Sequence, residues 1–241
     1  MKKHKKLIIS LSAFVTVLLA VFIGCAVYVN DYYRAEDTSI ATMAGAYNYT
    51  VEECDGNIVF IPNEPVAGLI FYPGGKVEHT AYAPLMVEFA QNGVLCVLVE
   101  MPFRLAVLDI NAADGIQDNF PQIDKWYIGG HSLGGAMAAS YVSNHMSEFD
   151  GLLLLGAYST ADISDSGLSV ISIYGSEDKV LNMEKYEENR ELLPSEFTEL
   201  IIEGGCHSYF GNYGHQDGDG EPSVSIEEQI KQTVNAFMEL L

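Results

Sequence analysis

The segment 126–139 constrains the fold of this chain more than any other part of the sequence. It reads Trp-Tyr-Ile-Gly-Gly-His-Ser-Leu-Gly-Gly-Ala-Met-Ala-Ala, so an apolar stretch leads into glycines around one serine and then into small helix-forming residues. The core of the segment matches the pattern G-x-S-x-G, which places a serine on a sharp strand-to-helix turn where glycines let neighbouring backbones approach. We therefore predict a strand over 126–129, a helix over 133–145 and a strained Ser132 between them.

The rest of the chain continues this alternation of strand and helix. The predicted strands are mostly continuous apolar runs, as expected for parallel strands that are buried on both faces. Further strands are predicted over 58–61, 68–72, 94–99, 151–155, 170–174 and 199–202, and further helices over 81–91, 183–192 and 226–240. Strands that alternate with helices predict the α/β class, with right-handed crossovers and a doubly wound, mostly parallel sheet. No second linker divides this part of the sequence, so we expect one domain.

A serine hydroxyl is a weak nucleophile, so Ser132 requires a base and an acid that orients the base. In a strand-turn-helix serine site the chain order is serine, acid, histidine. Asp178 lies four residues beyond a predicted strand, and we prefer it to Glu177, whose side chain points elsewhere. His207 follows the next predicted strand in a loop, and we prefer it to His215, which lies deeper in a Gly-rich acidic loop. Ser132, Asp178 and His207 are the candidate catalytic triad.

Two backbone N–H groups are candidates for binding the oxyanion that forms during acyl transfer. Leu133 begins the helix after the serine, where free N–H groups and the positive end of the helix dipole meet. Gly74 and Gly75 follow the strand predicted over 68–72, and their lack of side chains leaves the backbone accessible. We assign the donors as the N–H groups of Leu133 and Gly75, with Lys76 as the alternative to Gly75.

With Ser132, Asp178 and His207 in this order, the chain resembles the α/β-hydrolase superfamily, and within it a small branch without a cap domain that is similar to the dienelactone-hydrolase-like proteins. The resemblance covers residues 55–240 and is carried by the stretches 71–78, 81–85, 100–106, 129–136 and 204–214. It implies a serine esterase-type hydrolase without a cofactor. Pro73-Gly74 stands where many members have His-Gly. Dienelactone hydrolases use a cysteine nucleophile, so their substrate is not expected for a chain with serine at this position.

The first thirty residues form a separate, apolar segment. Residues 7–29 contain no charged side chain and are long enough to cross a bilayer as a helix. Lysines at positions 2, 3, 5 and 6 precede the run and no acid occurs before Asp31, so the positive-inside rule leaves the N-terminus in the cytoplasm. A cleaved signal peptide and a lipid on Cys25 are alternatives with the same topology. We predict a cytoplasmic tail over 1–6, a transmembrane signal anchor over 7–29, a stalk or lead-in over 30–54 and an extracytoplasmic catalytic domain over 55–241.

The charge of the chain is strongly asymmetric. It has 12 basic and 33 acidic residues, a formal net charge of -21. Four lysines belong to the N-terminal tail, so from residue 31 onward the balance is 8 minus 33, or -25. Such an acidic domain repels phosphate backbones, which makes DNA and RNA poor candidate partners, and it favours neutral or cationic substrates over anionic ones.

Cysteines and clustered acids give no sign of a metal site. Cys54, Cys96 and Cys206 lie outside the apolar run, are odd in number and match no zinc motif. A disulfide between Cys54 and Cys206 is conceivable from the sequence but unsupported by it. The acidic stretch 216–221 has the clustered carboxylates of a calcium loop, but Pro222 follows where more ligands are needed. We interpret that stretch as a solvated turn and predict neither a metal nor a cofactor.

These observations predict a membrane-anchored, extracytoplasmic serine hydrolase that cleaves a carboxylic ester through an acyl-enzyme. Its expected partners are a small-molecule or cell-envelope ester and the membrane that residues 7–29 span. The connection 157–168 is too short for a cap domain, so the site is expected to be open. The alternatives are an acyltransferase of the same fold with a cell-envelope acceptor, and a non-catalytic binding module.

Overall fold

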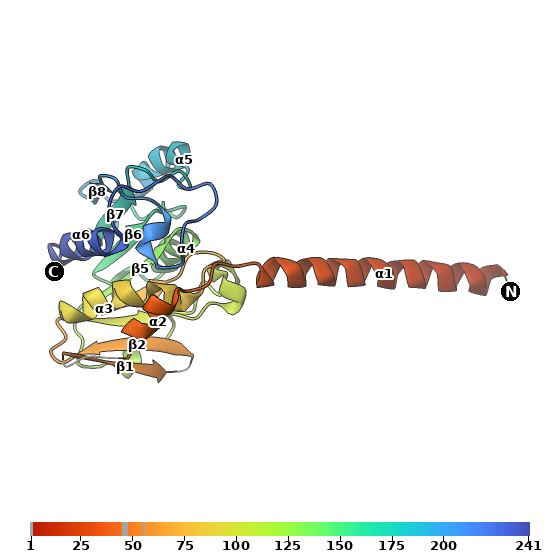
Figure 1. Ribbon diagram of the computed structural model, residues 1–241, viewed down its shortest axis with the longest axis horizontal. Helices are drawn as coiled ribbons and strands as arrows, with labels where there is room; N and C mark the ends of the chain where they lie inside the picture. The colour runs from red at the N-terminus through yellow and green to blue at the C-terminus, as the bar shows by residue number, and fades with distance from the viewer. Residues whose placement is uncertain (1, 45–47, 55) are drawn as a thin grey trace. The chain divides into compact units, whose positions relative to one another are not determined.

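The computed structural model describes residues 2–44, 48–54 and 56–241. The chain divides into two compact units, the first ending at Tyr32 and the second running from Tyr33 to Leu241 (Figure 1). The first unit is the helix α1 (Lys2–Asn30). Its part from Leu11 to Asn30 has a mean hydropathy of 2.4 and is not buried in the structure, so it is long and apolar enough to cross a membrane. This agrees with the prediction of one apolar N-terminal helix.

The second unit is built on one sheet, in which the described residues form eight strands in the order β1-β2-β4-β3-β5-β6-β7-β8. The strands are β1 (Tyr49–Cys54), β2 (Asn57–Pro62), β3 (Ala67–Tyr72), β4 (Val94–Leu98), β5 (Trp126–His131), β6 (Gly151–Leu155), β7 (Ser169–Gly175) and β8 (Thr198–Ile202). Every pairing from β4 to β8 is parallel, and β1 and β2 form an antiparallel edge. The α/β class and the mostly parallel sheet are therefore confirmed.

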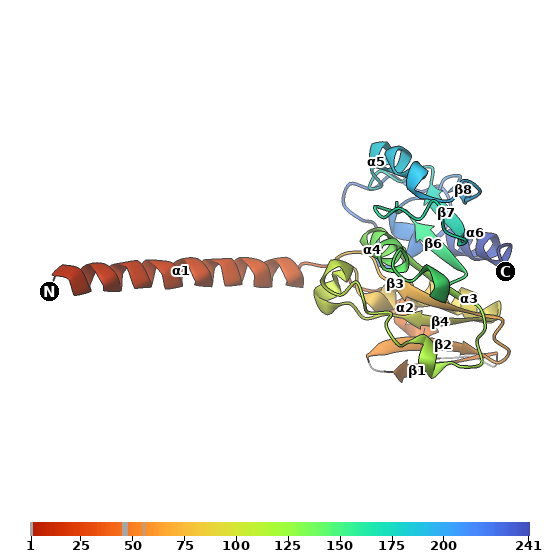
Figure 2. The same ribbon diagram turned by 180° about the vertical axis from the view of Figure 1, so that it is seen from behind.

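Helices cover both faces of the sheet (Figures 1 and 2). Along β3, Leu69 and Phe71 pack into one core layer while Ile70 and Tyr72 pack into the other, as the two-residue period of a strand requires. The first layer is closed by α3 and α6 and the second by α4. The helices are α2 (Asp37–Thr42), α3 (Ala83–Gln91), α4 (Leu133–Val142), α5 (Met183–Glu188) and α6 (Ile226–Met238). Short 3-10 helices occur at His79–Tyr82, Pro102–Arg104, Ala106–Leu108, Gln117–Asn119, Met146–Glu148, Arg190–Leu192 and Ser208–Phe210.

The segment 30–54 is more structured than the stalk or lead-in that the sequence predicts. It contributes α2 and the edge strand β1 to the second unit. The pattern of continuous apolar runs does not find β1, because this strand alternates between inward and outward residues and carries Glu52 and Glu53. Charged side chains are usual on an edge strand, since they discourage pairing with another sheet.

The parallel strands end together at one edge of the sheet. The loops after β3, β5, β7 and β8 therefore meet there, although they are far apart in the sequence. Ligands bind at this carboxyl edge in open α/β sheets. Three of these loops carry candidate site residues. They are the glycine loop (residues 73–78) after β3, the acid loop (176–182) after β7 and the histidine loop (203–225) after β8.

Candidate active site

Ser132 lies on a strained turn between β5 and α4. Its φ of 52° and ψ of -121° are unusual for a residue with a side chain. Its N–H donates to the carbonyl oxygen of Leu155 at 2.9 Å, which joins the turn to the end of β6. A Cβ placed on Gly134 or Gly130 would lie 2.1 or 2.5 Å from the Tyr72 carbonyl oxygen, so only glycine fits on either side of the turn. The predicted turn is therefore present, and the Ser132 side chain is partly exposed at its tip.

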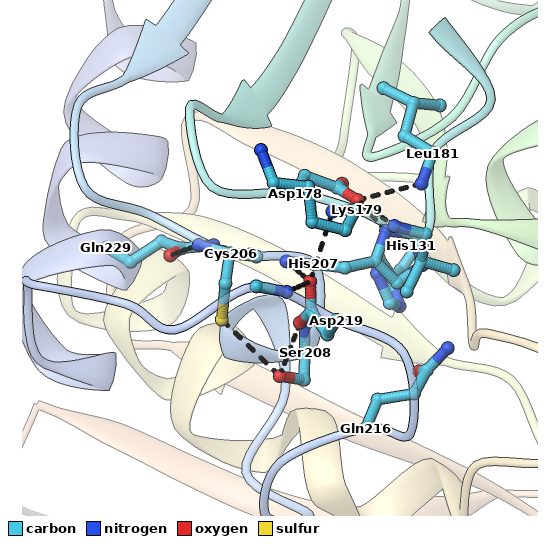
Figure 3. A network of polar contacts seen from close by, with 12 residues as sticks. His131, Asp178, Lys179, Leu181, Cys206, His207, Ser208, Gln216, Asp219 and Gln229 are labelled. Carbon is cyan, nitrogen blue, oxygen red and sulfur yellow. Dashed lines mark hydrogen bonds and ion pairs between the residues drawn. The ribbon is translucent and has the colours of Figure 1, made fainter.

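The structure brings Asp178 and His207 together. Asp178 Oδ2 lies 2.8 Å from His207 Nδ1, and both side chains are buried, with 0% and 1% of their surface exposed. Asp178 Oδ1 accepts hydrogen bonds from the N–H groups of Val180 and Leu181 at 2.9 and 2.8 Å (Figure 3). One carboxylate oxygen is therefore fixed by the backbone of the acid loop, and the other is free to orient the imidazole.

The two alternatives to this pair lie elsewhere. The Glu177 side chain is exposed, 4.0 Å from the ammonium of Lys179, and His215 is exposed in the histidine loop. Neither is placed to act with Ser132. The reason is local: Glu177 and Asp178 are neighbours in a turn, so their side chains point to different sides of the chain.

Gly156 connects the acid-histidine pair to the serine turn. It directly follows Leu155, the acceptor of the Ser132 N–H, and has a φ of +50°. A Cβ on Gly156 would lie 2.9 Å from His207 Nδ1 and 3.2 Å from Asp178 Oδ2. Ser132 and the pair therefore contact neighbouring residues at the end of β6, Leu155 and Gly156.

The free nitrogen of His207 is the atom that would act as a base. Because Nδ1 faces Asp178, the lone pair needed for proton transfer lies on Nε2. Nε2 is buried and makes no hydrogen bond in the described part of the chain, so it is not hydrogen-bonded to Ser132 Oγ here. Hydrogen bonds of this kind are often long in unliganded enzymes and tighten when substrate binds.

The glycine loop offers one N–H group next to the serine turn. Gly74 N–H donates to Tyr82 Oη at 3.0 Å, and Lys76 N–H donates to the Arg104 carbonyl oxygen at 2.8 Å. Gly75, between them, lies against Leu133, since a Cβ on Gly75 would be 2.9 Å from Leu133 Cδ2. Because the Lys76 N–H already donates to the Arg104 carbonyl oxygen, the Gly75 N–H is the better candidate for the second oxyanion donor.

Tyr82 and His131 form a buried pair that sequence reasoning did not single out. Tyr82 Oη accepts from Gly74 N–H and is also hydrogen-bonded to His131 Nδ1 at 2.8 Å. Burial lowers the pKa of His131 well below its usual value, and the neighbouring His207 lowers it further. The His131 and His207 rings are 4.4 Å apart, and a neutral His131 adds no positive charge beside the base. Only the tertiary contact reveals this pair, because Tyr82 and His131 belong to different elements.

Asp219 departs from the prediction of a solvated turn over 216–221. Its carboxylate accepts from the N–H of His207 at 3.2 Å, and from the N–H and hydroxyl of Ser208 at 2.8 and 2.9 Å (Figure 3). It also accepts from the N–H groups of Gly220 and Lys179, the latter in the acid loop. Burial raises the pKa of Asp219, but the donated hydrogen bonds outweigh burial, so the net pKa is lowered. Asp219 therefore pins the backbone of the histidine loop and links it to the acid loop.

A second side chain holds the histidine loop from α6. Gln229 is fully buried, and its amide both accepts from the N–H of Cys206 at 3.1 Å and donates to the Cys206 carbonyl oxygen at 2.8 Å.

The four described cysteines are free thiols, so the conceivable disulfide between Cys54 and Cys206 is not formed. Burial raises the pKa of the Cys206 thiol to about 11, which leaves it protonated near neutral pH.

An open cavity of about 390 Å³ lies beside Ser132. Its lining includes no charged side chain and consists of Ser132, Leu133, Ala136, Met137, Gly156, Ala157, Tyr158, Thr160, Val180, Leu181 and Asn182. This volume is within the range of small-molecule sites. Among the described residues, no group of three His, Cys, Asp or Glu side chains is arranged to hold a metal ion.

Known proteins share this fold. The sequence matches the model of the Alpha/beta hydrolase family over residues 68–231, more than half of the chain. Comparison with curated protein sequences finds no match. Dienelactone hydrolase from Anabaena variabilis superposes with a TM-score of 0.59 at 14% identity, covering 80% of this chain and 99% of that one. Est1E from Butyrivibrio proteoclasticus gives 0.56 at 14% identity over 80% and 98% of the two chains, and carboxyl esterase 2 from Tuber melanosporum gives 0.58 at 10% over 88% and 91%. At these identities the superpositions show the fold alone.

Proposed function

Because the chain belongs to the alpha/beta hydrolase family, we propose that it is a membrane-anchored serine hydrolase that cleaves carboxylic esters. The family match confirms the resemblance seen in the sequence and supports a hydrolase. The observation that carries the serine mechanism is the buried Asp178–His207 pair at 2.8 Å, which lies against Gly156, the residue after the Leu155 carbonyl that holds the strained Ser132. A site that only binds its ligand has no need for this arrangement.

In the proposed mechanism His207 Nε2 takes the proton of Ser132 Oγ as the oxygen attacks the ester carbonyl. The Asp178 carboxylate holds the imidazole by Nδ1 and stabilises its protonated form. The N–H groups of Leu133 and Gly75 bind the oxyanion. His207 then gives its proton to the departing alcohol, and water attacks the acyl-enzyme by the same route in reverse.

A fluorophosphonate probe tests this proposal, because an activated serine displaces its fluoride and becomes phosphonylated. We expect the wild-type chain to be labelled, and Ser132→Ala to lose the label. Ser140→Ala is the matched control, since Ser140 lies two turns further along α4 and should not affect labelling. The hydrolase proposal fails if the wild type is not labelled, and the choice of nucleophile fails if Ser132→Ala still is.

The anchoring proposal rests on α1 and on the lysines that precede its apolar part. We expect the chain to stay with the membrane pellet after alkaline carbonate extraction. External protease added to intact cells should digest residues 33–241, because the positive-inside rule leaves them outside. Release by carbonate, or protection from protease, would contradict the proposed topology.

A further inference from the structure

The first residue of the globular unit is bound directly to the glycine loop. Tyr33 N–H donates to the Lys76 carbonyl oxygen at 2.8 Å, and Glu78 N–H donates to the Tyr33 carbonyl oxygen at 2.9 Å. Together these hydrogen bonds make a parallel bridge between Tyr33 and Val77. Tyr33 is thus attached beside Gly75, the proposed oxyanion donor.

Tyr33 also contacts the histidine loop. Its Oη accepts a hydrogen bond from Asp217 N–H at 3.1 Å, and its ring centroid lies 5.6 Å from that of Tyr213. The two loops that would supply the oxyanion donor and the base are therefore both fastened to the start of the globular unit.

Tyr33 follows the last residue of α1, Asn30, by only three residues. Three extended residues reach at most about 11 Å, whatever the orientation of the two units. With α1 crossing a bilayer as proposed, this covalent link holds the carboxyl edge of the sheet close to the membrane surface.

Three of the most exposed apolar side chains of the globular unit lie at the same edge. Among described residues of the globular unit, four large apolar side chains are more than half exposed: Val66, Phe103, Val107 and Leu108. Three of these belong to the segment 103–108, which follows β4 at the carboxyl edge and contains one charged residue, Arg104. The Arg104 carbonyl oxygen accepts the Lys76 N–H, so this segment is joined to the same loop as Tyr33. Val66 lies just before β3, at the opposite edge.

The structure thus points to a substrate class, and we propose that the substrate is an ester lipid resident in the membrane that holds α1. This inference rests on the proposed function. Phe103, Val107 and Leu108 would enter the boundary between the lipid headgroups and the acyl chains, and the uncharged cavity beside Ser132 would take part of the lipid. Ser132 takes the acyl group, the alcohol leaves with the proton from His207, and one water molecule releases the carboxylic acid.

The test uses the full chain in phosphatidylcholine vesicles with two esters of one leaving group. 4-Methylumbelliferyl dodecanoate partitions into the bilayer and 4-methylumbelliferyl butanoate stays in water, so the ratio of their rates measures access to the membrane-resident substrate. The triple variant F103S/V107S/L108S should lower this ratio about tenfold, the equivalent of burying one apolar side chain. Val66→Ser is the control, since it removes an equally exposed apolar side chain from the far edge, and it should keep the wild-type ratio.

A second variant leaves the globular unit unaltered. A flexible insertion of twenty Gly and Ser residues between Asp31 and Tyr32 has an end-to-end distance of about 25 Å, so the site is no longer held at the surface. We expect the ratio to fall here as well. Unchanged ratios in both variants, with butanoate still hydrolysed, would overturn the lipid-substrate inference and leave the hydrolase standing. If the wild type hydrolyses neither ester, the proposed function itself is overturned.

Discussion

At the scale of single residues, the site is held by buried polar groups that satisfy one another. Tyr82 links the Gly74 N–H to His131, and Asp219 gathers N–H groups around His207. Leaving such a group unpaired costs about 1–3 kcal/mol, so each pair restricts the backbone that carries a residue of the proposed site. The geometry of the site therefore depends on residues that do not react.

His131 should make stability depend on pH. Its folded-state pKa is lowered by burial, whereas in the unfolded chain it binds a proton below about pH 6.5. Its contribution to stability is complete above that pH and is lost as the pH falls, by up to about 1.4 kcal/mol per pH unit. We expect His131→Asn to remove this slope from the free energy of unfolding between pH 7 and pH 5, measured by urea titration. Burial also lowers the pKa of His79, but His79 is present in both proteins and contributes equally to the two slopes. Equal slopes in the two proteins would contradict the assignment.

Asp219 should affect turnover through the position of His207. Asp219→Asn turns one acceptor oxygen into a donor that faces the N–H groups of His207 and Ser208. We expect kcat for a soluble ester to fall by about tenfold to a hundredfold, the range for a small misplacement of a catalytic group, with KM nearly unchanged. The exposed Asp217, changed to Asn, is the control. A wild-type kcat for Asp219→Asn would show that the carboxylate does not position the base.

At the scale of elements, the close crossing of α4 over β3 sets the serine turn. Gly130 and Gly134 face the Tyr72 carbonyl oxygen, so the helix begins almost in contact with the neighbouring strand. The sequence predicts this crossing well, because glycine spacing and apolar runs are local signals. The seven predicted strands correspond to β2 to β8. The sequence does not predict β1, because this strand alternates, carries acidic residues and is stabilised by its pairing with β2 rather than by a continuous apolar run.

Gly134→Ala should test this crossing. Its added methyl would meet the Tyr72 carbonyl oxygen at 2.1 Å and the Pro73 carbonyl oxygen at 2.3 Å. Alanine favours a helix by about 1 kcal/mol, but overlap with two backbone oxygens that cannot rotate away outweighs this gain. We expect a loss of at least about 2 kcal/mol in the urea-derived free energy of unfolding. Gly167→Ala, where nothing lies within 4 Å of the added methyl, should change it little, and equal effects of the two variants would contradict the close approach.

At the scale of the whole molecule, charge and topology are divided between the two units. Four lysines lie in the first turns of α1, and residues 31–241 carry a formal charge of 8 minus 33, or -25. A domain so acidic sets up a field that attracts cations and repels anions around its surface. Contact of the segment 103–108 with a membrane would therefore depend on apolar side chains rather than on attraction to anionic lipids.

Salt should reveal this field in the encounter with soluble esters. We expect kcat/KM to be higher for a cationic ester, such as butyrylcholine, than for a carboxylate-bearing butanoate ester. The ratio should shrink as the ionic strength rises from about 0.01 M to about 1 M, because the screening length falls from about 30 Å to about 3 Å. A ratio that does not respond to salt would mean that the pocket, and not the net charge, selects the substrate.

The sequence by itself determined the order of the strands from β2 to β8, the four longer helices among and after them, the glycine-flanked serine turn and the order of Ser132, Asp178 and His207 along the chain. Each of these depends on neighbouring residues, whose spacing encodes local structure directly. Only the tertiary structure decided that Gly75 and not Lys76 lies free beside Leu133, that Asp219 holds the histidine loop, and that Tyr33 is hydrogen-bonded to both the glycine loop and the histidine loop. Those contacts join segments that are distant in the chain, and they arise because parallel strands deliver their loops to one edge of the sheet.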